Sequence, residues 1–401
     1  MKDKNIGIIG QGFVGNAIRE KFKDQYRVFT YDKLNTDKSL IYHKDEISGT
    51  DGVNLIISLN TLIQHNDIIF VCVPTPMYED GECDISIVES VICDISKECE
   101  VLDRNVKVIV KSTVPPGTTN KLNSISNNVT VAFSPEFLTE ANATEDFDKQ
   151  TRIVLGLDYA ELVEPITQLF LKVFPKADLV IINSIEAEMT KYMTNLFLAT
   201  KVSFFNDMYS ICEKLNIDYN NVIEATLHDP RIGKSHYDVP GPDGDRGFGG
   251  HCFPKDLSAM LHIADSNKLA VPTLTGVDFT NKLVRKNKDW EKMEGRAVSK
   301  RIEESADDLQ NLPNVVLVES TSFSVNSEDP LHISYSEELP SKKWIVIKCR
   351  NFLTELNAPL EDEILYMFSK KVGYYLELKK ETESDLELDE INLISNQQFE
   401  D

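Results

Sequence analysis

The stretch NIGIIGQGFVG, residues 5–15, determines how the amino-terminal half of the chain is expected to fold. Residues 5–10 have the apolar pattern of a short buried strand, and residues 16–22 have the pattern of a helix. A second strand pattern at 26–31 ends at Asp32. A glycine-rich turn between strand and helix, with an acidic residue after the next strand, is typical of dinucleotide-binding folds. The expected cofactor turn comprises Gly10, Gln11, Gly12, Phe13, Val14 and Gly15.

The residue types of this turn suit a dinucleotide chemically. Glycines permit a tight turn and a close approach of the pyrophosphate, and the helix amino terminus offers unpaired N–H groups to the anion. Asp32 can accept hydrogen bonds from the adenosine ribose hydroxyls, which favours NAD over a 2′-phosphorylated cofactor. Lys33 and Lys38 weaken that preference. A structural turn without a ligand is the alternative interpretation.

Five further strand patterns predict that this turn belongs to a doubly wound, Rossmann-type parallel sheet. Amphipathic segments near 86–100 and 160–174 lie between some of these strands, which occupy residues 67–73, 106–112, 129–134, 152–157 and 179–182. Ligands of such sheets bind at the carboxyl ends of the strands. Three turns follow strand ends, at 74–76, 111–117 and 134–140. We therefore expect them to form one ligand cleft, although each alone is also ordinary turn chemistry.

Composition restricts the class of protein. A chain of 401 residues with 41% hydrophobic residues is long enough for two or three domains. The net charge of −23 disfavours general binding to nucleic acid or to anionic membranes, and no apolar run reaches the length of a membrane span. Seven cysteines without a CxxC pair, and no signal-peptide pattern at the start, predict reduced thiols and a cytoplasmic location.

The middle of the chain reads as helical. Asn183 and Glu186 are expected to cap a helix that runs to Lys214, on which Lys191 and Asn195 project from one face. Because most of that helix is apolar, Lys191 either reaches solvent at an edge or is held for a function. Further helical patterns occupy 215–227, 257–267 and 277–298. The expected domains are 1–183 for the cofactor, 184–299 for the helices and 300–401 as an acidic segment.

A glycine-rich loop, GFGGHCFPKD at 247–256, contains a single thiol, Cys252. It ends an irregular segment, 238–250, long enough to enclose a substrate. A thiol becomes a strong nucleophile once cationic or dipolar surroundings lower its pKa. A structural cysteine beside a turn is the simpler interpretation.

Together these stretches resemble the UDP-glucose/GDP-mannose dehydrogenase family. The resemblance covers residues 5–298 and rests on motifs that occur in the family's order. They are GxGxxG at 10–15, VPTP at 73–76, KSTVP at 111–115, SPEFL at 134–138 with Glu140, the helix with Lys191 and Asn195, PRIG at 230–233, and GFGGHCFPKD at 247–256.

The resemblance implies two successive NAD-dependent oxidations that convert the C6 alcohol of a nucleotide sugar, UDP-glucose first among candidates, to a carboxylate. It implies that Cys252 adds to the aldehyde, giving a thiohemiacetal and then a thioester that water hydrolyses. It implies that Lys191 and Asn195 stabilise the oxyanion. The water would be positioned and deprotonated by Asp256, Glu140 and Thr113, with the actual base left open.

The same resemblance assigns binding residues. Besides the turn, the NAD site would contain Asp32, Val73, Pro74, Thr75, Pro76, Ser112, Thr113, Glu140 and Lys255. The sugar nucleotide would be held by Glu136, Phe137, Leu138, Glu140, Lys191, Asn195, Phe248, Gly249, Gly250 and Cys252. Arg231 would reach the substrate of a partner subunit, which implies a homodimer built on the middle helices. No metal ion is implied.

The carboxyl-terminal quarter departs from the family. Nothing after residue 298 has the pattern of the second nucleotide-binding α/β domain, and the insertion at 238–245 is longer than usual. Strand patterns at 315–318 and 344–349, a helical one at 360–372 and an acidic run at 381–390 predict a small α+β module with a partly disordered tail. This segment is either an appendage without chemistry, a substrate lid or a partner-binding domain.

Two other classes of function remain open at this point. One is a two-electron dehydrogenase resembling 6-phosphogluconate or hydroxyisobutyrate dehydrogenases, whose reactions need no thiol. The other is a dimeric scaffold that keeps a cofactor fold while residues 300–401 recruit a partner. The joint presence of Cys252, Lys191, Asn195 and Asp256 favours the four-electron enzyme over both.

Overall fold

The computed structural model describes residues 5–34, 41–42, 58–125, 128–138 and 143–300, together with the backbone of seven short strands after residue 300. The chain divides into two compact units, Met1–Lys300 and Arg301–Asp401. Each unit is described by itself below.

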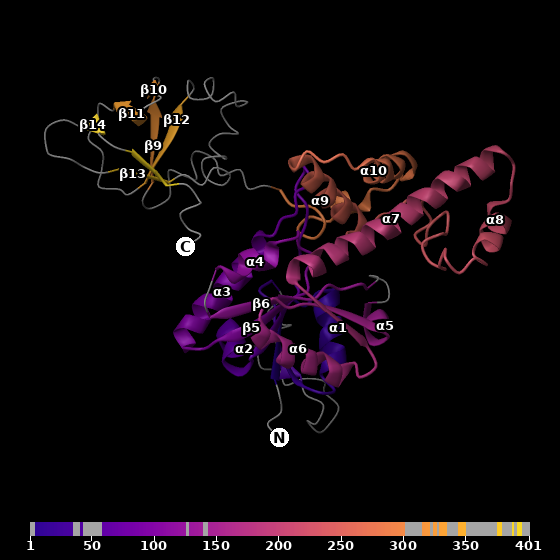
Figure 1. Ribbon diagram of the computed structural model, residues 1–401, viewed down its shortest axis with the longest axis horizontal. Helices are drawn as coiled ribbons and strands as arrows, with labels where there is room; N and C mark the ends of the chain where they lie inside the picture. The colour runs from indigo at the N-terminus through magenta and orange to yellow at the C-terminus, as the bar shows by residue number, and fades with distance from the viewer. Residues whose placement is uncertain are drawn as a thin grey trace. The chain divides into compact units, whose positions relative to one another are not determined.

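The first unit contains an eight-stranded sheet with the order β3-β2-β1-β4-β5-β6-β7-β8 (Figure 1). The bounds are β1 (Asn5–Ile9), β2 (Arg27–Tyr31), β3 (Ile41–Tyr42), β4 (Ile68–Val71), β5 (Val106–Val110), β6 (Val129–Phe133), β7 (Arg152–Gly156) and β8 (Asp178–Ile182). Strands β2-β1-β4-β5-β6 pair in parallel, which confirms the predicted Rossmann-type sheet.

Two pairs of this sheet are antiparallel, and the sequence prediction lacked them: β2 with β3 and β6 with β7. The connection between β6 and β7 contains one described helix of six residues, α5 (Ala143–Asp148). Strand β7 runs back beside β6, and β8 then pairs with β7 in parallel. A strand pattern in the sequence carries no information on strand direction, so it could not predict this pairing.

Helices cover both faces of the sheet because strand residues alternate between two cores. Val108 and Val110 belong to the core of one face, and Ile109 between them belongs to the other. The first core includes residues of α2 (Leu59–His65), α3 (Ser86–Leu102) and α4 (Thr118–Asn123). The second includes residues of α1 (Phe13–Phe22), α5 and α6 (Ala160–Val173).

A helical region follows the sheet. Figure 1 shows α7 (Ser184–Lys214) extending from the sheet towards α8 (Tyr219–Thr226), with α9 (Phe253–Ser266) and α10 (Pro272–Val284) beside it. The predicted cap is confirmed: Glu186 N donates to Asn183 Oδ1 at 2.9 Å, and Asn183 N donates back to Glu186 Oε2 at 3.2 Å. This capping box fixes where α7 starts, and with it the register of Lys191 and Asn195.

Two helix predictions need correction. Helix α9 begins at Phe253 rather than at 257, with Pro254 in its first turn, so Cys252 is its N-cap residue. The predicted helix over 277–298 is wrong in extent, because α10 ends at Val284 and only a short 3₁₀ turn, η3 (Asp289–Lys292), follows. Arg285 adopts an extended backbone after α10 and buries its guanidinium against three carboxylates, which a continuing helix would have prevented.

In the second unit the structure describes strands alone. They are β9 (Val315–Ser320), β10 (Ser324–Asn326), β11 (Asp329–Ser334), β12 (Trp344–Cys349), β13 (Tyr375–Leu378), β14 (Glu387–Leu388) and β15 (Ile391–Ile394). The strands predicted at 315–318 and 344–349 are confirmed as β9 and β12, which pair in parallel. The helix predicted at 360–372 lies outside the described residues, and β14 lies within the acidic run.

Candidate active site

The cofactor turn has the backbone geometry that a dinucleotide requires. Gly10 has φ +90°, and a Cβ on Gly15 would lie 2.0 Å from Gly10 O, so both positions need glycine. A Cβ on Gly12 would meet no atom within 4 Å, which leaves open space at the start of α1. Asp32 directly follows β2, and its Oδ2 accepts the backbone N–H of Gln11 at 2.9 Å. The residues present therefore fit the pyrophosphate and ribose of a dinucleotide.

The three strand-end turns meet one another, and Lys111 joins them. Its Nζ donates to Ser134 Oγ and to Pro135 O, both at 3.2 Å, and lies 3.2 Å from Glu136 Oε2. The hydroxyl of Ser112 donates to Val73 O at 2.6 Å. These contacts place the ends of β4, β5 and β6 at the wall of one cavity of about 170 Å³.

This cavity brings together most of the predicted cofactor and catalytic residues. Among its lining residues are predicted ones from the cofactor turn, from the strand ends and from α7 and α9: Gly12, Phe13, Val14, Val73, Pro74, Thr75, Ser112, Thr113, Glu136, Leu138, Lys191, Cys252 and Lys255. Glu140, predicted for three roles, lies outside the described residues. The cofactor turn and the thiol of Cys252 therefore face the same space.

The thiol of Cys252 lies at the amino end of α9 in surroundings that favour the thiolate. Burial raises the pKa of this thiol, but a hydrogen bond from His251 and the charges of His251 and Lys191 outweigh it. The net result is a pKa below the ordinary value of a cysteine. Burial instead raises the pKa of Cys72, which lines the same cavity, to about 12. Of the two thiols that line this cavity, Cys252 is therefore the one whose surroundings favour the thiolate.

Lys191 is held inside the protein rather than at an edge. Only 6% of the residue is exposed, and its Nζ donates to Glu136 O and, at 3.4 Å, to Asn195 Oδ1. The interpretation in which this lysine reaches solvent is therefore wrong. Its ammonium lies 5.4 Å from the ring centroid of Phe137, which supplies a further favourable contact.

A chain of buried polar groups continues from Lys191. Asn195 Nδ2 donates to Asp256 Oδ2 at 2.6 Å, and Lys255 Nζ donates to Asp256 Oδ1 at 2.5 Å. Only 1% of Asp256 is exposed, so its charge is balanced by the Lys255 ammonium and hydrogen-bonded by Asn195 rather than by water. The negative charge of Asp256 raises the pKa of Lys255 although burial opposes it. In this arrangement the amide N–H₂ of Asn195 is bound to Asp256, so Asn195 orients the ammonium of Lys191.

The glycine-rich loop before Cys252 is fixed to α10 and to the turn after it. A Cβ on Gly249 would lie 2.1 Å from Arg285 Nη2, and Phe248 N donates to Asn281 Oδ1 at 2.8 Å. Gly250 N donates to the carboxylate of Asp289. The Phe248 side chain is buried in a core with Leu257 and Val277. Phe248, Gly249 and Gly250 do not line the cavity of Cys252, so their predicted contact with substrate stays a prediction.

Arg285 connects the inserted segment 238–245 to this loop. Its guanidinium lies 2.6 Å from Asp243, 3.7 Å from Asp245 and 3.3 Å from Asp289. Asp245 also accepts the backbone N–H of Asn287 at 2.7 Å. The insertion is therefore a fixed part of the loop that precedes Cys252.

Other predicted residues lie apart from the cavity. Arg231 is exposed and forms an ion pair with its neighbour Asp229 at 2.5 Å. Eight further predicted residues do not line the cavity: Gly10, Gln11, Gly15, Asp32, Pro76, Phe137, Asn195 and Asp256. The three turn residues and Asp32, which binds Gln11, belong to the cofactor turn or contact it. Phe137, Asn195 and Asp256 contact Lys191 or Lys255, which do line the cavity.

The sequence analysis placed Lys111 in a turn of the expected cleft without giving it a role. It missed four other lining residues, which are Cys72, Ala143, His251 and Arg296. The Arg296 guanidinium lies 4.6 Å from the ring centroid of Phe13 in the cofactor turn. Its segment is held there by Met77 N, which donates to Ala297 O at 2.9 Å. No motif marks this arginine, whereas the position of His251 next to the thiol was a signal that could have been used.

Fold and site together define a Rossmann-type dinucleotide-binding protein in which the cofactor turn shares a cavity with an activated thiol. The NAD-binding domain of the UDP-glucose/GDP-mannose dehydrogenase family matches residues 4–174, and the central domain of the same family matches residues 185–283. The chain belongs to the UDP-glucose/GDP-mannose dehydrogenase family, and its cofactor is NAD.

Individual relatives agree with this assignment. The UDP-glucose 6-dehydrogenase of Rickettsia typhi is 34% identical over 298 residues, which are 70% of this chain and 67% of the relative. That of Rickettsia prowazekii is 35% identical over 222 residues, or 54% of this chain and 49% of the relative. A solved UDP-glucose dehydrogenase from Pyrobaculum islandicum has 30% identity and a TM-score of 0.58, covering 70% of this chain and 68% of that one.

The match is partial in length. This chain spans about half the length of the Rickettsia prowazekii and Rickettsia bellii relatives, at 49% and 51%. In the part of the chain that the structure describes, no helix is both long and apolar enough to cross a membrane.

Proposed function

We propose that this protein catalyses the NAD-dependent, four-electron oxidation of a nucleotide-sugar C6 alcohol to the carboxylate. The observation that carries the proposal is the cavity lined by the cofactor turn, Lys191 and Cys252 together. A hydroxyacid-type dehydrogenase needs a cofactor turn and a lysine, but a thiol with a lowered pKa has no task in such a reaction.

The residues of the cavity suit each chemical step. NAD held at the cofactor turn would supply the hydride acceptor for each oxidation, which would give two NADH for each sugar. The Lys191 ammonium stabilises the alkoxide of the first oxidation and the oxyanion formed when Cys252 adds to the aldehyde carbon. That addition gives a thiohemiacetal, whose carbon has a hydrogen and an alkoxide oxygen, so a second hydride can leave and a thioester remains. Water then cleaves the thioester and restores the thiol.

Three residues are candidates for the group that activates this water. Thr113 lines the cavity, Asp256 lies behind it and binds Lys255 and Asn195, and Glu140 lies outside the described residues. Asp256 has both oxygens occupied by hydrogen-bond donors, which suits a residue that positions Lys255 and Asn195 better than one that takes a proton.

UDP-glucose is the substrate we propose first, because the relatives from Rickettsia carry the name UDP-glucose 6-dehydrogenase. We expect the nucleotide to be bound by residues beyond 300, by the partner subunit or by the loop 238–250.

The proposed function is tested by counting NADH. Purified protein incubated with excess NAD and a limiting amount of UDP-glucose should produce two NADH for each sugar and release UDP-glucuronate. GDP-mannose and UDP-N-acetylglucosamine serve as competing substrates in parallel reactions. One NADH for each sugar would indicate a two-electron enzyme, and no reaction with any nucleotide sugar would favour the scaffold interpretation.

A homodimer through α7 is part of the proposal. The exposed side of α7 and its C-cap carry an apolar stripe whose members repeat at helical spacing: Met193, Phe197, Phe204, Ile211 and the C-cap residue Leu215. Met193 and Phe197 are 66% and 64% exposed, which is unusual for large apolar side chains on one helix face. Arg231, exposed on the segment after α8, would then reach the partner's substrate.

A division into domains at 183 and 299 and a cytoplasmic location belong to the same proposal.

Replacing Phe197 with aspartate is expected to convert the dimer to a monomer, because it places a charge in the centre of the apolar stripe. Size-exclusion chromatography with light scattering measures the mass directly. Val101→Asp, at an exposed apolar position near the end of α3, is the matched control and should leave the mass unchanged. A wild-type monomer at micromolar concentration would refute the dimer.

A further inference from the structure

A second and larger cavity, of about 780 Å³, lies between the turn at 77–81, α9 and the segment 290–300. It shares no lining residue with the cavity of Cys252. The two cavities therefore have separate surroundings, although α9 contributes side chains to both.

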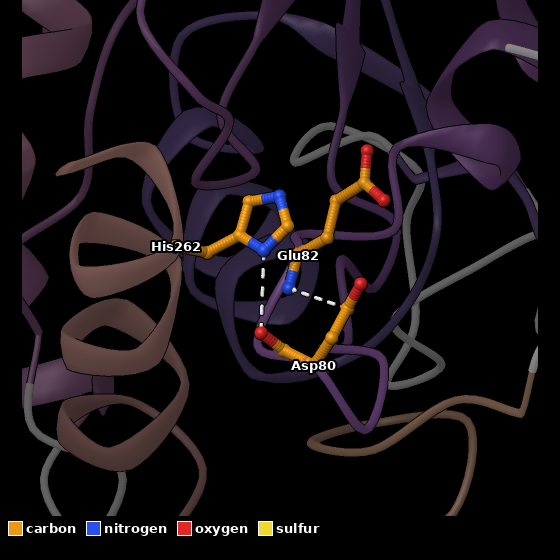
Figure 2. Close-up of side chains that lie close together, drawn as sticks. All are labelled: Asp80, Glu82 and His262. Carbon is orange, nitrogen blue, oxygen red and sulfur yellow. Dashed lines mark hydrogen bonds between the residues drawn. The ribbon is translucent and has the colours of Figure 1, made fainter. Parts of the chain in front are cut away.

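Three potential metal ligands form a cluster at the edge of this second cavity, which Asp80 and His262 line. Asp80, Glu82 and His262 each offer one ligand atom, and these atoms all lie within 4.8 Å of one another. Figure 2 shows the two carboxylates extending from the turn and His262 facing them from α9. The ligands thus come from two elements separated by 182 residues in sequence.

The turn that carries the carboxylates has a fixed shape and a fixed place against α9. Tyr78 N donates to Glu82 O at 2.8 Å, and Glu82 N donates to Asp80 Oδ1 at 3.1 Å. Gly81 has φ +86°, and a Cβ there would lie 3.0 Å from Ser258 O of α9. A glycine is therefore needed for the turn to approach α9 this closely. Because the backbone is set before any ligand arrives, little ordering would be required on binding.

The ring of His262 has the orientation that metal ligation uses. Its Nδ1 lies 3.2 Å from Asp80 O, a backbone carbonyl that can only accept. In the neutral imidazole this contact places the proton on Nδ1 and leaves the lone pair on Nε2. Ligating histidines commonly bind a backbone carbonyl through the second ring nitrogen, since this fixes the tautomer and the ring plane.

The charge around the cavity also favours a cation. Its carboxylates are Glu79, Asp80, Asp265, Asp278, Glu291 and Glu294, against three lysines, Lys282, Lys292 and Lys300. One lysine is already paired with Asp278 at 2.7 Å, and another lies 3.7 Å from Glu294. The excess of carboxylates gives the cavity a negative potential.

We propose that Asp80, Glu82 and His262 bind a divalent transition-metal ion, with Mn²⁺ and Zn²⁺ as the fitting class. One imidazole and two carboxylates are a mixed set that Mn²⁺ and Zn²⁺ accept, whereas Mg²⁺ and Ca²⁺ prefer oxygen ligands throughout. Water in the cavity fills the remaining coordination positions. The ion fastens the turn at 78–82 to α9, the helix that begins after Cys252, and it takes no part in hydride transfer or thioester chemistry.

The test is a titration of metal-free protein with Mn²⁺, followed by electron paramagnetic resonance of the unbound ion. We expect one Mn²⁺ for each chain, displacement by Zn²⁺ and little competition from Mg²⁺. His262→Gln keeps the size of the side chain and removes the imidazole, and should weaken binding by about tenfold or more. Asp265→Asn is the matched control, since Asp265 lines the same cavity outside the cluster, and its affinity should stay within about twofold.

Thermal unfolding gives a second readout that does not depend on enzymatic activity. Mn²⁺ should raise the melting temperature of the wild type and of Asp265→Asn, because an ion that binds the folded state alone stabilises it. It should leave His262→Gln and Asp80→Asn unchanged, with circular dichroism showing that both variants are folded. The proposal would be overturned if the wild type bound no Mn²⁺, or if His262→Gln bound it as tightly as the wild type. It would also be overturned if Asp265→Asn lost as much affinity as His262→Gln.

Discussion

Replacing Cys252 with serine is expected to abolish formation of the carboxylate while the protein still folds and binds NAD. A serine hydroxyl is a far weaker nucleophile at neutral pH, and the surroundings that lower the pKa of the Cys252 thiol do not bring a hydroxyl near ionisation. Loss of a catalytic nucleophile reduces kcat by a factor on the order of 10³ to 10⁶. NADH stoichiometry and the rate of uronate formation measure the effect, with NAD binding followed by fluorescence.

Two comparisons make this result specific to the position of the thiol. Cys72→Ser alters a thiol in the same cavity whose pKa burial raises to about 12, so the stoichiometry should stay at two NADH for each sugar. Iodoacetamide at pH 7 should alkylate Cys252 faster than Cys72, and His251→Ala should slow this alkylation because the hydrogen bond of His251 lowers the Cys252 pKa. An unchanged stoichiometry in Cys252→Ser would contradict the thioester mechanism.

Features that depend on a few adjacent residues were predictable from the sequence. The cofactor turn, the strands around it and the capping box of Asn183 each follow from local pattern, and the structure contains all of them. The fixed start of α7 then implies that Lys191 and Asn195 share a face. The meeting of three turns in one cavity was also predictable, because parallel strands end at a common edge.

Features that depend on distant partners were not predictable. Arg285 ends α10 because its charge meets carboxylates of the 238–245 insertion and of Asp289, and periodicity contains no such information. Arg296 reaches the cofactor turn because its segment pairs with Met77, more than 200 residues earlier. The antiparallel direction of β7 is set by its pairing with β6, which a strand pattern does not encode. In each case a tertiary contact decides between local conformations that the sequence allows.

Replacing Lys191 with methionine is expected to reduce kcat by roughly 10² to 10³, with a much smaller change in the affinity for NAD. Methionine keeps most of the length and apolar stem of lysine, but it removes the one ammonium that lines the cavity from α7. The developing oxyanion then lacks the positive charge that we propose to stabilise it. Steady-state kinetics and NAD fluorescence titration separate the two effects, and Lys214→Met in the exposed last turn of α7 is the control.

A structural role for Lys191 would give a different result. Asp256 keeps Lys255 and Asn195 as partners in the Lys191→Met variant, so no buried carboxylate loses its counter-charge, and the melting temperature should change little. A large drop in melting temperature with normal kcat in the folded fraction would mean that Lys191 only holds Glu136 and Asn195 in place. A folded variant that binds NAD but oxidises slowly would instead place the ammonium at the reacting oxygen. The remaining activity should then fall equally in both oxidations, because the alkoxide and the thiohemiacetal oxyanion use the same charge.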